Sequence, residues 1–216
     1  MGIEVGEGAV VALALAAASV GALHSLAPDH WAPFAAVARA RRWSPARTAR
    51  ITVLCGLGHV SGSVALALLG LTLGIELFSR LGGRLEAIAC VMLIGFGLAY
   101  ALWGLRRATR GRLHAHQNGA RDPSRITAWS LFLLFTADPC VAVIPVLLAT
   151  APLGWARTLF VIVVYELATI ITMLALVLPA RAGMERLRLH WIDHWGDAAA
   201  GLCIAIVGIA VSLLGW

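Results

Sequence analysis

Long apolar segments recur along the whole chain and constrain its fold more than any other feature. Each has roughly 20 residues or more, enough at about 1.5 Å per residue to cross a hydrocarbon core about 30 Å thick. The chain is 60% hydrophobic and 13% charged, too little polar surface for a water-soluble protein of 216 residues. Unpaired backbone groups are not tolerated in lipid, and β-barrel alternation is absent. We therefore predict an all-α integral membrane protein with six transmembrane helices, over 8–37, 51–74, 85–104, 127–150, 156–179 and 197–215.

The basic residues are distributed unevenly among the loops between these segments. All seventeen are arginine, and all but Arg80, Arg84 and Arg157 lie in the first, third and fifth loops. By the positive-inside rule, this places both termini outside the cytoplasm of a bacterial-type inner (plasma) membrane. Basic loops beside a lipid bilayer also account for the net charge of +6 without a nucleic-acid partner.

The chain divides into two halves of three segments each. We expect a single transmembrane domain over 1–216, with a first half (1–105), a basic cytoplasmic loop (106–126) and a second half (127–216). Halves with an odd number of spans are inverted relative to each other. "LAPDHWAPF" in the first segment and "TADPCVAVIP" in the fourth both place an aspartate beside a proline. Proline-broken helices at matching positions of inverted halves are typical of the binding site of a transporter.

Six ionisable side chains lie deep within the apolar segments. Such residues are costly in a membrane and mark a functional site by default. They comprise three imidazoles and three carboxylates with no arginine among them, so a bound cation is the expected counter-charge. A mixed nitrogen and oxygen ligand set suits a divalent transition metal such as Ni²⁺, Co²⁺, Zn²⁺ or Mn²⁺. The candidate metal-site residues are His24, Asp29, His30, His59, Asp138 and Glu166.

The spacing of the first three candidates conflicts with a regular helix. At about 100° per residue, His24 and His30 would be offset by roughly 120° and could not share an ion comfortably. Pro28 removes a backbone donor and biases Ala27 towards an extended conformation. We therefore expect the helix to open at Pro28, so that the three side chains converge, and Pro139 to open the fourth segment in the same way.

These residues carry a resemblance to a known family. "HSLAPDH" matches the H-x4-D-H pattern of the nickel/cobalt transporter family, "GLGHVSG" resembles its Gly-His motif, and "LLFTADP" resembles a third motif centred on an aspartate. Ala27 stands where that family usually has another aspartate. The length and the inverted halves resemble the related six-span exporters of the LysE-like superfamily. The resemblance implies a permease for Ni²⁺ or Co²⁺, and it leaves uptake and efflux open.

The leading hypothesis is a secondary transporter, not an enzyme, which moves a divalent metal ion by alternating access and has no permanent cofactor. His24, His30 and His59 would be neutral nitrogen ligands and Asp29 the principal carboxylate. Asp138 and Glu166 would balance the remaining charge. Metal binding to such ligands releases protons, which predicts coupling to the proton gradient.

Two other functions stay open at this stage. A transmembrane thiol-disulfide electron carrier would share the six-span inverted architecture and would use Cys55 and Cys140. A metal-binding assembly factor would bind its partners through the basic loops and transport no ion. Replacing both cysteines by serine distinguishes the carrier from a metal transporter.

Overall fold

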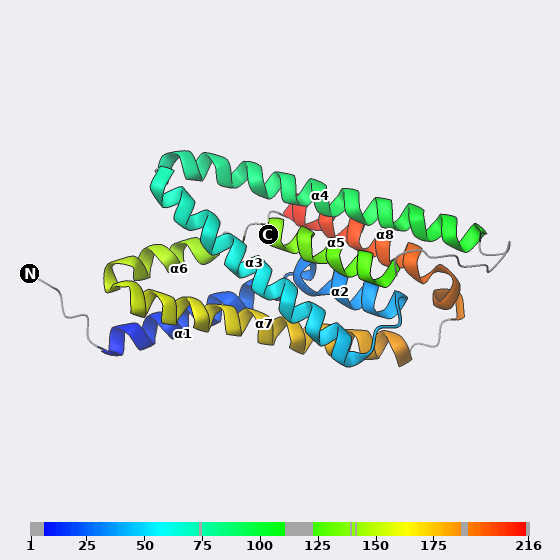
Figure 1. Cartoon of the computed structure of the whole chain (residues 1–216), viewed down its shortest axis with the longest axis horizontal. Coiled ribbons are helices and arrows are strands. Elements are labelled where there is room, and N and C mark those ends of the chain that lie inside the picture. The colour runs from blue at the N-terminus through cyan, green and yellow to red at the C-terminus, as the bar shows by residue number, and fades with distance from the viewer. Residues whose placement is uncertain are drawn as a thin grey trace, which may run out of the picture.

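The computed structural model describes residues 7–73, 75–110, 123–138, 140, 142–186 and 190–214, with side chains except at 66–67, 69–86, 89, 107, 110, 123–126, 190–194 and 214. Helices make up almost all of this part of the chain, and it contains no strand (Figure 1). The predicted all-α class is thus confirmed. The helices are α1 (Glu7–His24), α2 (Pro28–Ala40), α3 (Pro45–Leu73), α4 (Ile75–Arg110), α5 (Pro123–Ala137), α6 (Val143–Thr150), the 3-10 turn η1 (Ala151–Leu153), α7 (Trp155–Arg186) and α8 (His190–Leu214).

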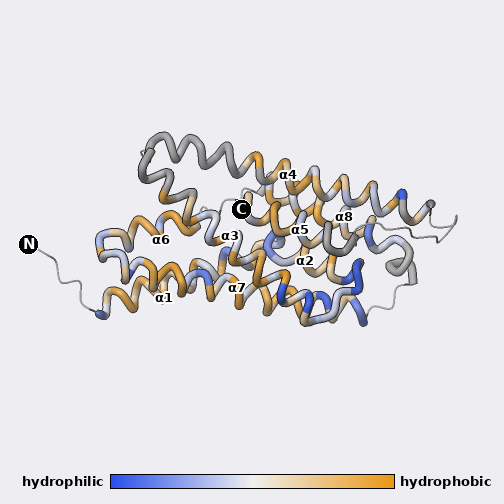
Figure 2. Tube along the Cα trace, in the orientation of Figure 1, coloured by the Kyte–Doolittle hydropathy of each residue, from blue (hydrophilic) through white to orange (hydrophobic). Residues whose placement is uncertain are grey.

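The composition and surface of the helices suit a membrane protein. Among the described residues, three stretches are long and apolar enough to cross a bilayer: Glu7–His24, Trp155–Arg186 and Trp195–Leu213. Shorter apolar stretches run over Cys90–Arg106, Thr127–Ala137 and Val143–Leu153. Apolar residues dominate much of the described trace, whereas hydrophilic ones gather mainly at the end where α2 and α7 finish and α3 begins (Figure 2). An apolar exterior with polar ends is the arrangement that lipid favours.

The first and fourth apolar segments are each broken into two helices. α1 ends at His24 and α2 starts with Pro28 in its first turn. Ala27 has φ −57° and ψ 134°, the extended conformation expected before proline. The predicted opening at Pro28 is therefore confirmed. In the second half α5 ends at Ala137 and α6 begins at Val143; Pro139 itself lies outside the described residues.

The two broken helices run in opposite directions through the molecule (Figure 1). α1 packs against α7, and α5 packs against α3, so each lies on an unbroken helix of the other half. α4 and α8 pack closely against each other through small residues, as helices in lipid often do. A Cβ added at Gly97 or Gly104 would collide with the α8 backbone at Ala205 or Ala198.

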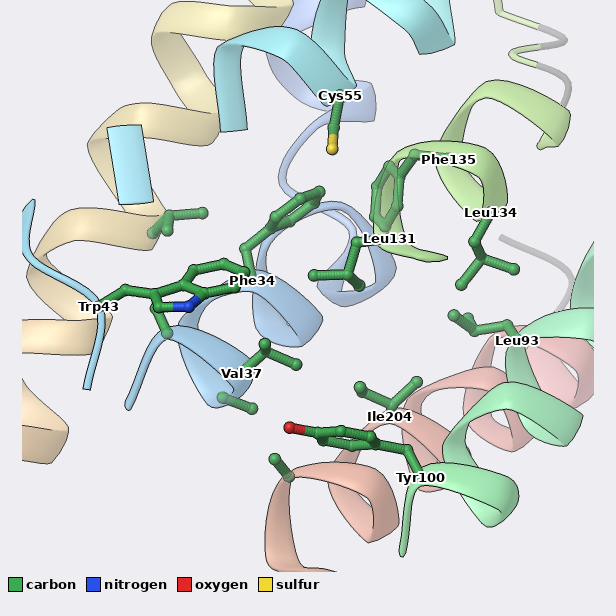
Figure 3. Close-up of a cluster of buried hydrophobic side chains, with 14 of the residues drawn as sticks. Phe34, Val37, Trp43, Cys55, Leu93, Tyr100, Leu131, Leu134, Phe135 and Ile204 are labelled. Carbon is green, nitrogen blue, oxygen red and sulfur yellow. The ribbon is translucent and has the colours of Figure 1, made fainter. Parts of the chain in front are cut away.

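A cluster of buried aromatic and aliphatic side chains holds α2, α3 and α5 together (Figure 3). Phe34 and Phe135 lie at its centre, with ring centroids 4.4 Å apart. Trp43 and Cys55 pack against the same cluster. Because Phe135 contacts both the cluster and the histidines described below, this packing fixes one wall of the candidate site.

A buried polar network joins α2 to three other helices at the arginine-rich end. Arg41 Nε lies 3.3 Å from Asp197 Oδ1 on α8 and donates to Tyr100 Oη on α4 at 2.9 Å. Arg41 Nη2 donates to Thr127 Oγ1 on α5 at 3.2 Å, and Tyr100 Oη donates to Asp197 Oδ1 at 2.8 Å. The guanidinium also stacks over Trp103, 4.4 Å from the ring centroid. The network connects the two halves of the chain.

Candidate metal centre

Three histidines from three helices meet in the interior. His24 is the last residue of α1, His30 lies in the first turn of α2, and His59 lies midway along α3. One ring nitrogen from each falls within 4.8 Å of the others. The break at 25–27 lets His24 and His30 approach, with ring centroids 4.3 Å apart. The sequence predicted that His24, Asp29 and His30 converge; the structure instead groups His24 and His30 with His59 from α3, and Asp29 is not among the converging ligand atoms.

His30 is oriented by the residue that precedes it. Its Nδ1 lies 2.9 Å from Asp29 Oδ1. A carboxylate accepts hydrogen bonds, so Nδ1 is the donor, and in the neutral ring Nε2 keeps its lone pair. His30 is 2% exposed, and its ring has little freedom to turn away. A carboxylate that holds the far nitrogen of a histidine is a common arrangement around metal ligands.

His59 is oriented in the same way by a backbone group. Its Nδ1 lies 3.0 Å from the carbonyl oxygen of Phe135, near the end of α5. A carbonyl only accepts, so this nitrogen is the donor, and in the neutral ring His59 Nε2 also keeps its lone pair. The side chain is 1% exposed. The two histidines therefore share a tautomer that leaves Nε2 available.

The two available nitrogens face each other. His30 Nε2 and His59 Nε2 are 3.4 Å apart. Two lone pairs at this distance repel unless a proton or a cation lies between them. Two nitrogens each about 2.05 Å from one metal ion in a tetrahedral site are about 3.3 Å apart. The observed spacing fits two ligands on one tetrahedral ion, and it equally fits a hydrogen bond in which one ring carries the proton.

His24 completes a three-nitrogen face. Its Nε2 is buried and has no hydrogen-bond partner among the described residues. Buried polar atoms without a partner are rare and costly, and they require an explanation. A ligand bound among the three rings would supply the missing partner.

The three predicted carboxylates occupy different positions relative to this face. Asp29 lies behind His30, where it holds Nδ1. Asp138 lies in the break after α5 and interacts electrostatically with His24, His30 and His59. Glu166, in the first half of α7, does not belong to the convergent group of ligand atoms, although its buried Oε1 has no partner in the described structure. The structure thus brings together the histidines and places the acids around or away from them.

Two groups that bond to His59 were not predicted from the sequence. The first is the carbonyl of Phe135, and the second is Ser63, one turn after His59. Ser63 Oγ donates to the His59 carbonyl oxygen at 2.6 Å and accepts from the Cys140 amide at 2.7 Å. It therefore ties α3 to the break between α5 and α6. A small polar residue four positions after a buried histidine, as in "GHVSGS", is the signal that could have indicated it.

The two cysteines of the electron-carrier hypothesis lie far from each other. Cys55 and Cys140 are both buried and free. Cys140 Sγ lies 2.9 Å from Tyr165 Oη, and its amide contacts Ser63. Cys55 lies eight residues before Ser63 on the same helix, or about 12 Å along its axis. A disulfide needs Cα atoms roughly 4.4–6.8 Å apart, so nothing in this arrangement favours a redox pair.

Comparison with known proteins identifies no relative. No protein-family model matches the sequence, and no curated protein or solved structure is significantly similar to it. The function is therefore argued from the site itself.

Proposed function

We propose that this protein transports a divalent transition-metal ion across a membrane through the site formed by His24, His30 and His59. One observation carries the proposal: three imidazole nitrogens from three helices converge in the interior of an apolar helical bundle. In two of the three rings, His30 and His59, Nδ1 donates to an oxygen acceptor, which leaves Nε2 as the nitrogen that can bind a metal. Ionisable residues at such a position in a membrane protein mark an ion pathway.

The geometry favours a tetrahedral ion of borderline softness. Imidazole ligands suit Zn²⁺, Ni²⁺ and Co²⁺, but Ni²⁺ is typical of square-planar sites and Zn²⁺ of tetrahedral ones. Of the two ions that the nickel/cobalt family resemblance implies, Co²⁺ adopts the tetrahedral arrangement more readily. In our proposal Asp29 orients His30 and does not bind the ion itself. Asp138 supplies negative charge nearby, since three neutral imidazoles leave the charge of the ion uncompensated.

The transport path would run between the two halves. We propose six membrane spans, with the arginine-rich end of the bundle at the cytoplasmic face and both termini on the opposite side. The two broken helices would then meet their unbroken partners near the midplane, where inverted-repeat transporters bind their substrates. Movement of one half against the other would expose the histidines to each side in turn. In the empty site a proton held between Nε2 of His30 and Nε2 of His59 would be displaced by the metal, and this exchange would couple transport to the proton gradient.

The test is metal uptake into liposomes that contain the purified protein, with Co²⁺, Zn²⁺, Ni²⁺ and Mn²⁺ compared. Replacing His30 or His59 with alanine should abolish uptake, because each removes a ligand whose orientation the structure fixes. The matched control is Cys55→Ser with Cys140→Ser, which leaves the histidines in place and should retain most of the uptake.

The liposome experiment can also contradict the proposal. Uptake that survives both histidine substitutions, or that disappears only in the cysteine variant, would refute the site. Metal bound by the purified protein but never moved would support the assembly-factor function instead.

A further inference from the structure

A groove separate from the histidine site lies between α3 and α5 near the arginine-rich end. Its volume is about 620 Å³. Most of its wall is apolar, and two of its lining residues, Leu54 and Trp129, are 56% and 65% exposed. The groove therefore opens on the outer surface of the bundle, where lipid would lie. It is lined by Arg47, Arg50, Ile51, Leu54, Cys55, Ala128, Trp129 and Phe132.

One end of the groove is strongly positive. Arg47 and Arg50 lie in the first two turns of α3, where the partial positive charge of the helix N-terminus adds to theirs. Arg47 stacks over Trp43 at 5.4 Å, and Arg50 Nε donates to the Ala46 carbonyl oxygen at 3.4 Å. Neither forms an ion pair with a carboxylate in the part of the chain that the structure describes. Two guanidinium groups that are not paired with a described carboxylate thus lie at one end of the apolar groove.

We infer that this groove binds one anionic phospholipid. The phosphate of the headgroup would pair with Arg47 and Arg50, since guanidinium groups bind phosphate through bidentate hydrogen bonds. An acyl chain would lie along Leu54, Trp129 and Phe132. The basic end of the groove fits the headgroup of such a lipid, and its apolar part fits an acyl chain. The exposed indole of Trp129 suits the boundary between headgroup and chain.

The bound lipid would brace the helix pair that positions His59. Phe132 lies one turn before Phe135, and Cys55 lies one turn before His59. A Cβ at Gly58 would lie 3.0 Å from the Phe132 ring, so α3 and α5 are already in close contact there. A lipid chain that contacts both helices adds apolar burial across this contact and should raise the stability of the folded protein. The inference does not depend on metal transport.

The test compares lipid binding by the purified full chain in a neutral detergent. Phosphatidylglycerol and phosphatidylcholine are added separately, and bound lipid is counted by native mass spectrometry alongside thermal unfolding. Phosphatidylglycerol should bind and raise the unfolding midpoint more than phosphatidylcholine does. Arg47→Gln with Arg50→Gln should weaken phosphatidylglycerol binding about 30-fold and remove this difference. The matched control, Arg106→Gln with Arg186→Gln, removes two exposed charges that do not line the groove and should behave like wild type.

A further variant distinguishes binding in the groove from general attraction between charges. Ala128→Phe keeps both arginines and fills the groove, so it should weaken phosphatidylglycerol binding as well. Circular dichroism of each variant identifies any that fails to fold, and lipid counting by mass spectrometry is then read only from folded variants. Equal phosphatidylglycerol binding by the groove and control variants would overturn the inference. Equal stabilisation by inorganic phosphate alone would overturn it too, because the groove would then be an anion site without a lipid chain.

Discussion

At the scale of single residues, the two ring nitrogens of His30 and of His59 have different tasks. In each ring Nδ1 is held by an acceptor, a carboxylate for His30 and a backbone carbonyl for His59. The held nitrogen fixes both the tautomer and the plane of the ring, so Nε2 points at a defined place before any ion arrives. Pre-oriented ligands lose little conformational entropy on binding. Asp29 therefore acts through His30.

Asp29→Ala should weaken Co²⁺ binding about 10-fold to 100-fold, the usual cost of losing an acceptor behind a metal ligand. Asp29→Asn keeps a carbonyl acceptor for Nδ1 and should weaken binding less. Titration of the purified protein with Co²⁺, followed by its visible absorption, measures both affinities and shows whether the ion is tetrahedral. Glu185→Gln, an exposed carboxylate at the end of α7, is the control. If Asn and Ala lower the affinity equally, orientation is not the role of Asp29.

The sequence predicted the histidines of the site but not what holds two of them in place. His24, His30 and His59 were identifiable because an ionisable side chain is conspicuous in an apolar segment. The acceptor of His59 was not, because every residue has a carbonyl and only the packing of α5 against α3 selects that of Phe135. The placement of Asp29 behind His30 was equally hidden. Adjacent residues on a chain can bind one ion together or bind each other, and backbone conformation decides which.

At the scale of helices, local chemistry predicted the breaks better than the lengths. Pro28 has a steric effect on its neighbours that operates in any context, and the chain opens there. Helix lengths depend on more than hydropathy. The predicted 85–104 segment is part of α4, which runs over Ile75–Arg110. Hydropathy reports the part of a helix that suits lipid, whereas the backbone hydrogen bonds continue into polar residues beyond it.

The pairing of α4 with α8 supplies a prediction at this scale. Gly97→Ala should destabilise the protein by about 1–3 kcal/mol, because its Cβ would collide with the α8 backbone at Ala205. Gly95→Ala, two residues away on the same helix, has nothing within 4 Å of the added Cβ. It should be neutral or slightly stabilising, since alanine favours a helix over glycine. Thermal unfolding in detergent compares the two. Equal destabilisation of the two variants would show that the close approach of α8 at Gly97 is not the cause of the loss.

At the scale of the whole molecule, the two ends of the bundle differ. α2 packs against α8 at the arginine-rich end. In the inverted arrangement that we propose, α6 and α4 are the counterparts of α2 and α8, and they make no contact in the part of the chain that the structure describes. The Arg41 network supplies the polar part of the α2 contact, and it links helices of both halves. A transporter that moves one half of the chain against the other must break this network whenever the arginine-rich end opens.

Removing one member of the network should therefore loosen that end. Arg41→Gln removes the guanidinium that lies 3.3 Å from Asp197 Oδ1 and donates to Tyr100 and Thr127, and it should lower the free energy of unfolding by about 3 kcal/mol. Adding Asp197→Asn should restore part of the loss, because the carboxylate that faced Arg41 is then a neutral amide. Glu185→Gln breaks a pair whose carboxylate is 43% exposed and should cost at most about 1 kcal/mol. Hydrogen exchange should show the last turn of α2 opening faster in Arg41→Gln than in Glu185→Gln. Equal exchange and equal stability in these two variants would mean that apolar packing alone closes this end, and that the charges of Arg41 and Asp197 have no part in gating.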